Sequence, residues 1–454
     1  MRERDAAVAA TRFGLGARPG EIEAAAEAGP RNWLRRQIAA GAPDLGPVPT
    51  SRECWLALLR YRDEVDRIQS EGGDDLEARI AEAQRRLREP ALAHVVARTG
   101  AAVAAEASFA ERWVRFWSNH FTVAASDQES AVLAPTLEAE AIRPNLFGAF
   151  ETLALASILH PAMLVYLDNH VSVGPNSPLG RHAGRGLNEN LAREALELHT
   201  VGSQAGYAQD DVEAFARALT GWTIGSRRLH RENQWGVGLF DPRLHEPGAQ
   251  RVMGVVYPDR GADQARSIIR NLARAPETAR RISEKIARHF LSDAPSEPQI
   301  AHIEQAWRRS RGSLAEVARA VIDAPGAFDP AFSKFKPPEA FLVSGLRALD
   351  AEPPEPEMLF PVFTAIGQIP FTAPSPEGWP DDEESWADPD AIKKRLEFSN
   401  ALARRVGDRA MPVQRAEAVL GERLDADTAL AVSRAESPVQ GFTLFLMSPD
   451  FMRR

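Results

Sequence analysis

The chain of 454 residues is poor in several features, and each shortage excludes a class of protein. Cys54 is the single cysteine, so no disulfide can form within the chain. Its apolar neighbours predict that it is a buried core residue. No apolar run reaches about 18 residues, so the sequence predicts no membrane span. The formal net charge is −9, and a surface of that sign has no general attraction for nucleic acid, so we expect no nucleic-acid partner.

The sequence motifs of several large enzyme classes are also missing. There is no H-E-x-x-H, no paired C-x-x-C, no EF-hand loop, no Walker loop and no G-x-S-x-G elbow. Gly14-Leu15-Gly16 lacks the third glycine of a dinucleotide fingerprint, and no predicted strand precedes it. Arg12 interrupts the small residues near the start before they form a signal-peptide core. If the chain as given is complete, we expect it in the cytoplasm.

What remains is mostly helical periodicity. The pattern predicts an all-α fold, one large helical body over residues 1–454, with a division near 325–335 as the alternative. Residues 51–88 carry many Glu–Arg pairs at helical spacing around Gly72-Gly73, which predicts a protruding charged helical hairpin. The non-helical island at 234–257 predicts one small β-hairpin, built from residues 235–240 and 251–257.

The segment 188–202 is the most informative candidate for a site. Its apolar residues form one helical stripe, and Asn190, Glu194 and Glu197 form a polar ridge at the edge of that stripe. A carboxylate at the edge of a buried stripe needs a partner, because an unpaired buried charge is costly. That partner is an arginine, a metal ion or a substrate, so a structural ion-pair network and a working site both fit.

Histidines and one aspartate supply further candidates. His120 continues an apolar helical face, which is typical of a hydrogen-bonded core histidine, and His199 occupies the last turn of the 188–202 helix. Asp168 ends a helix-like run, where capping explains it, and His245 lies in the loop of the predicted β-hairpin. Together with Glu194 and Glu197 these side chains offer enough ligands for a divalent metal, but their spacing matches no metal motif.

A tryptophan loop completes the candidate set. Trp379 lies in a Pro-rich, acidic stretch with Trp386 nearby. Such aromatic side chains line a ligand groove or anchor a long irregular segment to the body of the protein, and the sequence supports both interpretations equally.

Nine short segments together resemble the landmarks of a known bacterial family. They are RFGLG (12–16), PGEI (19–22), WSNHF (117–121), NENLARE (188–194), LHTVG (198–202), ALTGW (218–222), KPPE with GWP (336–339 and 378–380) and SPDF (448–451). In this order, over residues 5–454, they resemble family 1800 of the domains of unknown function.

The resemblance implies a bacterial protein of a family without an assigned activity. Its members are often exported and commonly encoded beside a sulfatase-like family of unknown function, numbered 1501, so the resemblance implies a periplasmic location and a sulfatase-like partner. The chain departs from the family pattern at Glu246, where aspartate is usual, at Gln250, where lysine is common, and at Ala208, where threonine is expected. If relatives use the aspartate and lysine chemically, this chain has altered or lost that step.

Two hypotheses of function follow. The first is an enzyme, metal-assisted or carboxylate-based and hydrolytic, with a site centred on the helix at 188–202. Its catalytic residues would be Glu194, Glu197, His199 and His120, and its substrate-binding residues Asn190, Asp168, His245 and Trp379. The alternative is a non-catalytic scaffold that binds a sulfatase-like protein or a polymer through the charged hairpin and the tryptophan loop.

Overall fold

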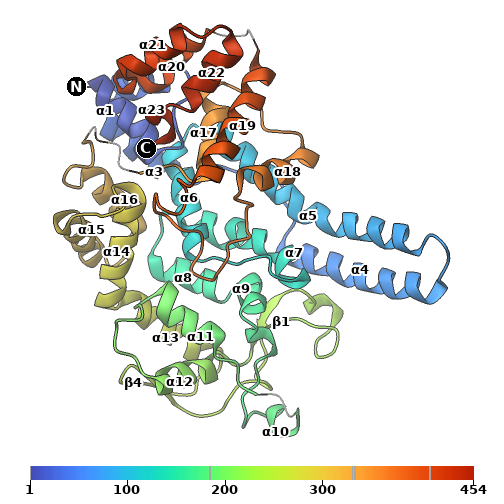
Figure 1. Cartoon of the computed structure of the whole chain (residues 1–454). Coiled ribbons are helices and arrows are strands. Elements are labelled where there is room, and N and C mark those ends of the chain that lie inside the picture. Colours follow the sequence, from blue (N-terminus) through green and yellow to red (C-terminus); the bar gives the residue numbers. More distant parts are fainter. Residues whose placement is uncertain (1, 184–185, 330, 332–333, 408–410) are drawn as a thin grey trace.

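The architecture was analysed in a computed structural model, which describes residues 2–183, 186–329, 331, 334–407 and 411–454. Helices dominate these residues, and two small antiparallel sheets of two strands each are the only sheets among them (Figure 1). The predicted fold class, predominantly helical with a small β-hairpin, is therefore confirmed. Within the same ranges, no helix is both long and apolar enough to cross a membrane.

The N-terminal quarter forms a small helical group and a long hairpin. Its elements are α1 (Arg2–Val8), the π-helical turn η1 (Ala9–Phe13), α2 (Glu21–Ala28), α3 (Pro30–Ala40), α4 (Ser51–Glu71) and α5 (Leu76–Ala104). Thr50 caps α4 in a capping box with Glu53, and Gly72 ends it at a φ of 66°. Figure 1 shows the far ends of α4 and α5 projecting from the body as an antiparallel pair.

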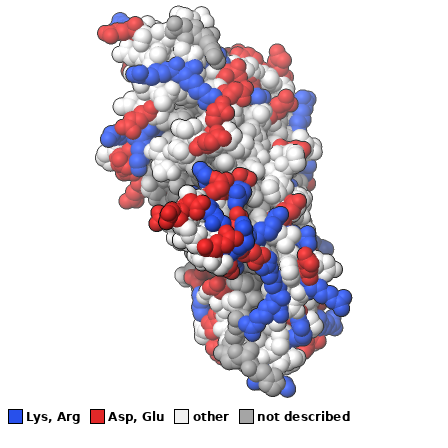
Figure 2. Space-filling view, turned by 90° about the vertical axis from the view of Figure 1, so that its right-hand side faces the viewer, with Lys and Arg blue, Asp and Glu red and all other residues white. Residues whose placement is uncertain are grey.

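Charges of both signs cover the projecting pair. Arg86 of α5 reaches Glu64 of α4 at 2.7 Å, and Arg79 bonds Glu71. Figure 2, which views the molecule from this side, shows basic and acidic side chains intermixed over the surface rather than segregated. The hairpin therefore pairs much of its charge within itself.

The middle of the chain builds the central body. Its first elements are α6 (Ser108–His120), α7 (Gln128–Leu137), the π turn η2 (Glu138–Ile142), η3 (Arg143–Asn145), α8 (Phe150–Ile158), α9 (Pro161–Tyr166), η4 (Asn169–Val171) and α10 (Gly180–Ala183). Then follow α11 (Asn190–Glu194), the π turn η5 (Ala195–His199), α12 (Gln209–Leu219) and η6 (Glu232–Gln234). On α6, Trp113, Phe116, Trp117 and His120 share the buried face, as their spacing predicts.

The strands pair differently from the prediction. β1 (Trp222–Ile224) pairs with β2 (Gly238–Phe240), whereas β3 (Gln250–Val252) pairs with β4 (Val255–Tyr257). Met253 and Gly254 join β3 to β4 with φ angles of 48° and 79°. Positive φ at both central residues is the geometry of a tight two-residue hairpin, so the segment 251–257 folds back on itself.

The remaining helices complete the body. They are α13 (Ala262–Arg274), α14 (Pro276–Phe290), α15 (Glu297–Ser310), α16 (Leu314–Asp323), α17 (Pro338–Ala348), α18 (Pro356–Ile366), α19 (Pro389–Val406), α20 (Pro412–Leu420), η7 (Gly421–Arg423), α21 (Ala426–Ser433), α22 (Pro438–Leu446) and α23 (Pro449–Met452).

Two hydrophobic clusters organise the described residues. The larger runs from Val8 to Phe328, and the smaller joins the N-terminal helices to α17–α23 from Phe341 onward. The sequence placed an alternative boundary near 325–335, and residues 330, 332 and 333 of that stretch lie outside the described residues. Both ends of the chain belong to the smaller cluster, so α1 and α23 lie near each other (Figure 1).

Candidate functional site

Helix α14 carries the cationic side chains of the candidate site. Pro276 starts the helix, and Ile282, Ile286 and Phe290, four residues apart, bury one face in the core. The adjacent stripe, one position earlier, holds Arg281 and Lys285. Burial of the apolar stripe therefore fixes the direction of these two cations.

Lys285 of this stripe lines a groove between α6, α14 and the loop at 374–382, whereas Arg281 is not part of its lining. The cavity has a volume of about 370 Å³, within the range of small-molecule sites. The side chains that bear on its chemistry are Phe116, His120, Lys285, Arg288, Glu377 and Trp379. Two residues predicted from the sequence, His120 and Trp379, thus line one groove.

Asn119 fixes the tryptophan side of the groove. Its Oδ1 accepts a hydrogen bond from the Trp379 backbone N–H at 2.8 Å, and its Nδ2 donates to the Trp379 carbonyl at 2.9 Å. Gly378 precedes it with a φ of 96°, and a Cβ there would lie 2.5 Å from the Asn119 carbonyl oxygen. The GWP motif therefore needs its glycine for close packing on α6, and Trp379 both anchors the loop and lines the groove.

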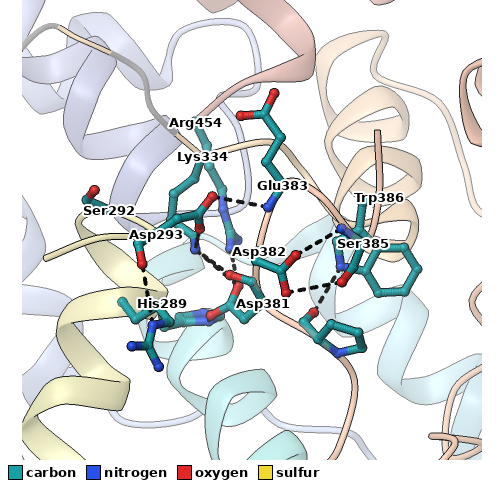
Figure 3. A network of polar contacts seen from close by, with 12 residues as sticks. His289, Ser292, Asp293, Lys334, Asp381, Asp382, Glu383, Ser385, Trp386 and Arg454 are labelled. Carbon is teal, nitrogen blue, oxygen red and sulfur yellow. Dashed lines mark hydrogen bonds and ion pairs between the residues drawn. The ribbon is translucent and has the colours of Figure 1, made fainter. Parts of the chain in front are cut away.

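A buried network holds the rest of this loop (Figure 3). The Nδ1–H of His289 donates to Asp381 at 2.7 Å, and Arg454 donates to the same carboxylate at 3.1 Å. Lys334 donates to the Asp381 carbonyl at 2.6 Å and contacts Asp293. These cations and the His289 hydrogen bond hold the pKa of Asp381 well below its ordinary value, although burial opposes the shift.

His289 itself is not free to act as a base. Its Nε2 accepts a hydrogen bond from the Arg112 Nε–H at 3.3 Å, so both ring nitrogens are engaged. Burial lowers its pKa to about 3. The His289–Asp381 pair therefore resembles half of a catalytic triad but serves to pin the loop.

His120 lines the groove, and His199 contacts its ring without lining the groove; both rings are uncharged. His120 Nε2 donates to the His199 carbonyl at 3.2 Å, which leaves its Nδ1 as an acceptor without a partner among the described residues. Neither ring nitrogen of His199 has a hydrogen-bond partner there. Burial lowers the pKa of His199 to about 3 and holds that of His120 well below its ordinary value, and the charge of Lys285 adds to both shifts.

Lys285 has no counterion at contact distance. It makes no hydrogen bond or ion pair with any residue that the structure describes. Burial lowers its pKa to about 8, with the charge of Arg281 adding and those of Glu377 and Asp381 opposing. Arg281, one turn earlier, donates to the Leu198 carbonyl at 3.3 Å, and its Nε is buried without a hydrogen-bond partner. Arg288 pairs with Glu284 at 2.9 Å.

The predicted carboxylates, Glu194 and Glu197, lie outside the lining of the groove. Glu194 ends α11, and burial raises its pKa, with the charge of Glu197 adding. Burial and the neighbouring Glu197 raise the pKa of Tyr207, and both groups act electrostatically on Arg281. Glu197 therefore lies near the cationic stripe, but neither carboxylate lines the groove itself.

The predicted single helix at 188–202 is in fact interrupted. An α-helix covers five residues and then becomes the π turn η5, and Gly202 ends the segment with a φ of 89°. A π turn bonds each residue to the fifth one before it, so a wheel drawn at α spacing misplaces the residues that follow. His199, at the end of this π turn, is buried, and burial keeps its ring uncharged.

Three predicted substrate-binding residues do not line the groove. Asn190 is exposed in the first turn of α11, and Asp168 is exposed at a φ of 57° after α9. His245, in the loop between β2 and β3, is buried, and its Nδ1 donates to the Thr220 carbonyl at 2.8 Å. Its Nε2 lies 3.7 Å from Asp259.

A closed ring of largely buried charges includes two residues of α6, Glu111 and Arg115. Three arginines alternate with three glutamates in the order Arg98, Glu138, Arg143, Glu111, Arg115, Glu339 and back to Arg98. The contacts of Arg143 with Glu111 and Glu138 are both 2.8 Å. Every acid in the ring meets two bases, so we interpret it as internal scaffolding.

The sequence reasoning missed both the ring and the cations of the groove. Among the described residues, no group of three His, Cys, Asp or Glu side chains could hold a metal ion, so the candidates do not assemble into a metal site there. The overlooked signal was the polar stripe of α14 beside its apolar stripe. This stripe forms no sequence motif, because the groups that act on it are distant in the chain. The Leu198 carbonyl, which accepts from Arg281, lies about 80 positions before it, and Glu377, which acts electrostatically on Lys285, about 90 positions after it.

The model of one protein family, described as "Protein of unknown function (DUF1800)", matches residues 8–453. No curated protein and no solved structure is significantly similar to the chain.

Proposed function

Since the chain belongs to the DUF1800 family of proteins of unknown function, we propose a function from the site itself: the protein is an enzyme that binds a small anionic substrate in the groove beside α14. The observation that carries the proposal is Lys285, a half-buried cation without a counterion among the described residues. Burying an unpaired charge is costly, and an anionic ligand would remove that cost.

The acids near the groove do not replace this ligand. Asp381 is held by His289, Lys334 and Arg454, and Asp382 accepts hydrogen bonds from Ser385. Glu377 acts on Lys285 only electrostatically. The groove thus combines a free cation with acids that are mostly engaged elsewhere.

Glu194 and Glu197 remain the candidates for acid–base chemistry. The raised pKa of Glu194 moves it toward the range that suits a general acid, and Glu197 lies near Arg281. The hydrolytic form of the hypothesis is kept as a proposal for these carboxylates.

Calorimetric titration with inorganic phosphate and with malonate at pH 7 tests the binding. We expect one of the two anions to bind the wild type at one site, and Lys285→Met to weaken that binding at least tenfold. Lys394→Met is the matched control, because Lys394 lies on the surface of α19 and pairs with Asp390 at 2.6 Å. Binding of phosphate alone identifies a phosphoryl substrate, and binding of malonate alone a carboxylate.

Two results contradict the proposal: no binding of either anion to the wild type, or equal binding to Lys285→Met. Hydrogen exchange on the wild type gives a second measurement that needs no variant. The bound anion should slow exchange in α14 and in the loop at 374–382 and leave the hairpin α4–α5 unchanged.

The alternative is a scaffold that uses the projecting hairpin α4–α5, and its observation is the projection itself (Figure 1). A sulfatase-like partner and a periplasmic location belong to this alternative as proposals. A variant that lacks residues 66–84, and so has a shortened hairpin, should then no longer bind the partner but should still bind the anion.

A further inference from the structure

Lysine is rare in this chain, and its five positions can be considered one by one. They are Lys285, Lys334, Lys336, Lys393 and Lys394, and the other 49 of the 54 basic side chains are arginine. A guanidinium stays charged at every physiological pH, whereas an amine can lose its proton and become a nucleophile. A lysine inside a groove of an arginine-rich protein therefore calls for an explanation.

Four of the five lysines have a visible structural role. Lys334 holds Asp293 and the Asp381 carbonyl. Lys336 donates to Ser344 at 3.1 Å and lies 3.8 Å from the centre of the Phe451 ring. Lys393 and Lys394 form surface pairs along α19. Lys285 alone lines the groove and makes no direct polar contact with a described residue.

The surroundings of Lys285 suit a reactive amine. With a pKa of about 8, roughly one tenth of it is neutral at pH 7. Burial beside a second cation, here Arg281, is a known way to activate a lysine nucleophile. His120 offers an unpartnered Nδ1 as a hydrogen-bond acceptor in the same groove.

We propose that Lys285 forms an imine with the carbonyl carbon of a small anionic aldehyde or ketone, of the 2-oxo acid class. The proposal rests on the proposed function and names its substrate class. The Nζ lone pair forms the C–N bond while the C=O π bond breaks to give a carbinolamine. The carbinolamine hydroxyl leaves with a proton as water, so one amine and one carbonyl yield one imine and one water without oxidation or reduction.

The cations of α14 supply the selectivity for an acid. Arg281 lies one turn before Lys285, and Arg288 lines the groove one turn after it. A carboxylate on the carbon next to the carbonyl would place its charge beside these side chains. A neutral aldehyde of similar size gains nothing from them.

Reductive trapping tests the inference directly. The wild type is incubated with glyoxylate and cyanoborohydride, and the peptides are mapped by mass spectrometry. We expect the reduced adduct to form on Lys285 at least tenfold faster than on the surface residues Lys393 and Lys394. Acetaldehyde, which lacks the carboxylate, should lose this preference, and the anion that binds the groove should slow the reaction at Lys285.

Lys285→Arg separates this inference from the proposed function. It keeps the positive charge and should retain anion binding, yet it should give no adduct at position 285, whereas Lys394→Arg should still be labelled at Lys285. If the wild type binds the anion but Lys285 is not labelled preferentially, the imine proposal is wrong and the proposed function is unaffected. Preferential labelling by glyoxylate without binding of phosphate or malonate overturns the proposed function as tested.

Discussion

Helix α6 contributes to two charged regions that differ in how their charges are balanced. The first, the ring of Arg98, Arg115 and Arg143 with Glu111, Glu138 and Glu339, contains as many acids as bases. The second, the groove, presents Lys285 without a counterion among the described residues, and its lining includes His120, which burial keeps uncharged.

This difference in charge balance distinguishes charges that stabilise the fold from a charge that is available to bind a ligand. In the ring each desolvated charge is compensated by a neighbour, so the group is complete without any other molecule. In the groove the desolvation of Lys285 lacks such compensation, and the loop network that reaches its edge uses its own acids internally. A buried group whose charges are balanced indicates a structural role, whereas an unbalanced charge in a cavity indicates a candidate functional site.

The largest expected effect comes from breaking the ring. Glu138→Gln leaves Arg98 and Arg143 each without one charged partner, and breaking a buried pair in this way costs about 3–5 kcal/mol. Urea unfolding should show the loss, while the exposed control Glu316→Gln should change stability by less than about 0.5 kcal/mol. A loss below about 1 kcal/mol for Glu138→Gln would mean that the ring is not a structural unit.

Removing the groove cation should not lower the free energy of unfolding, in contrast to breaking the ring. Lys285→Met deletes an unpaired, partly desolvated charge, so the free energy of unfolding at pH 7 should stay equal to that of the wild type or rise. Chemical denaturation of both proteins measures this. If Lys285→Met loses as much stability as Glu138→Gln, the groove belongs to the scaffold and the comparison fails.

The pH dependence of the free energy of unfolding makes this comparison of the wild type with Lys285→Met more specific. The pKa of Lys285 is about 8 in the folded protein and about 10.5 in the unfolded chain, so between these values the unfolded chain binds more protons. Stability of the wild type relative to Lys285→Met should therefore rise from pH 8 to about pH 10.5 and be constant below pH 7. Arg281, Glu377, Asp381 and Arg288 all act electrostatically on this amine.

The smallest expected effect belongs to the projecting hairpin, whose ion pairs are exposed. Arg86→Gln removes the pair with Glu64, in which both side chains retain much solvent contact. The free energy of unfolding should change by no more than about 0.5 kcal/mol, as thermal or urea unfolding can measure. A loss above about 1 kcal/mol would show that exposed pairs here behave like the buried ring.

Local sequence signals determined much of the fold. The helical class follows from the apolar periodicity, and the turn between α4 and α5 follows from Gly72-Gly73. Each of these features depends on residues within a few positions of one another, where hydrogen bonds and side-chain spacing are set by the helix itself. His120 and Trp379 were also identifiable, because each stands in a distinctive motif.

Only the tertiary structure decided which distant side chains meet. The π turn interrupted the helix predicted over 188–202, and the tight turn at Met253 and Gly254 changed the strand pairing. The ring brings together residues from 98 to 339, and the groove joins α6, α14 and the loop at 374–382. Charges are compensated by whatever packing places beside them, so whether Lys285 has a partner is a property of the folded protein and not of its neighbours in sequence.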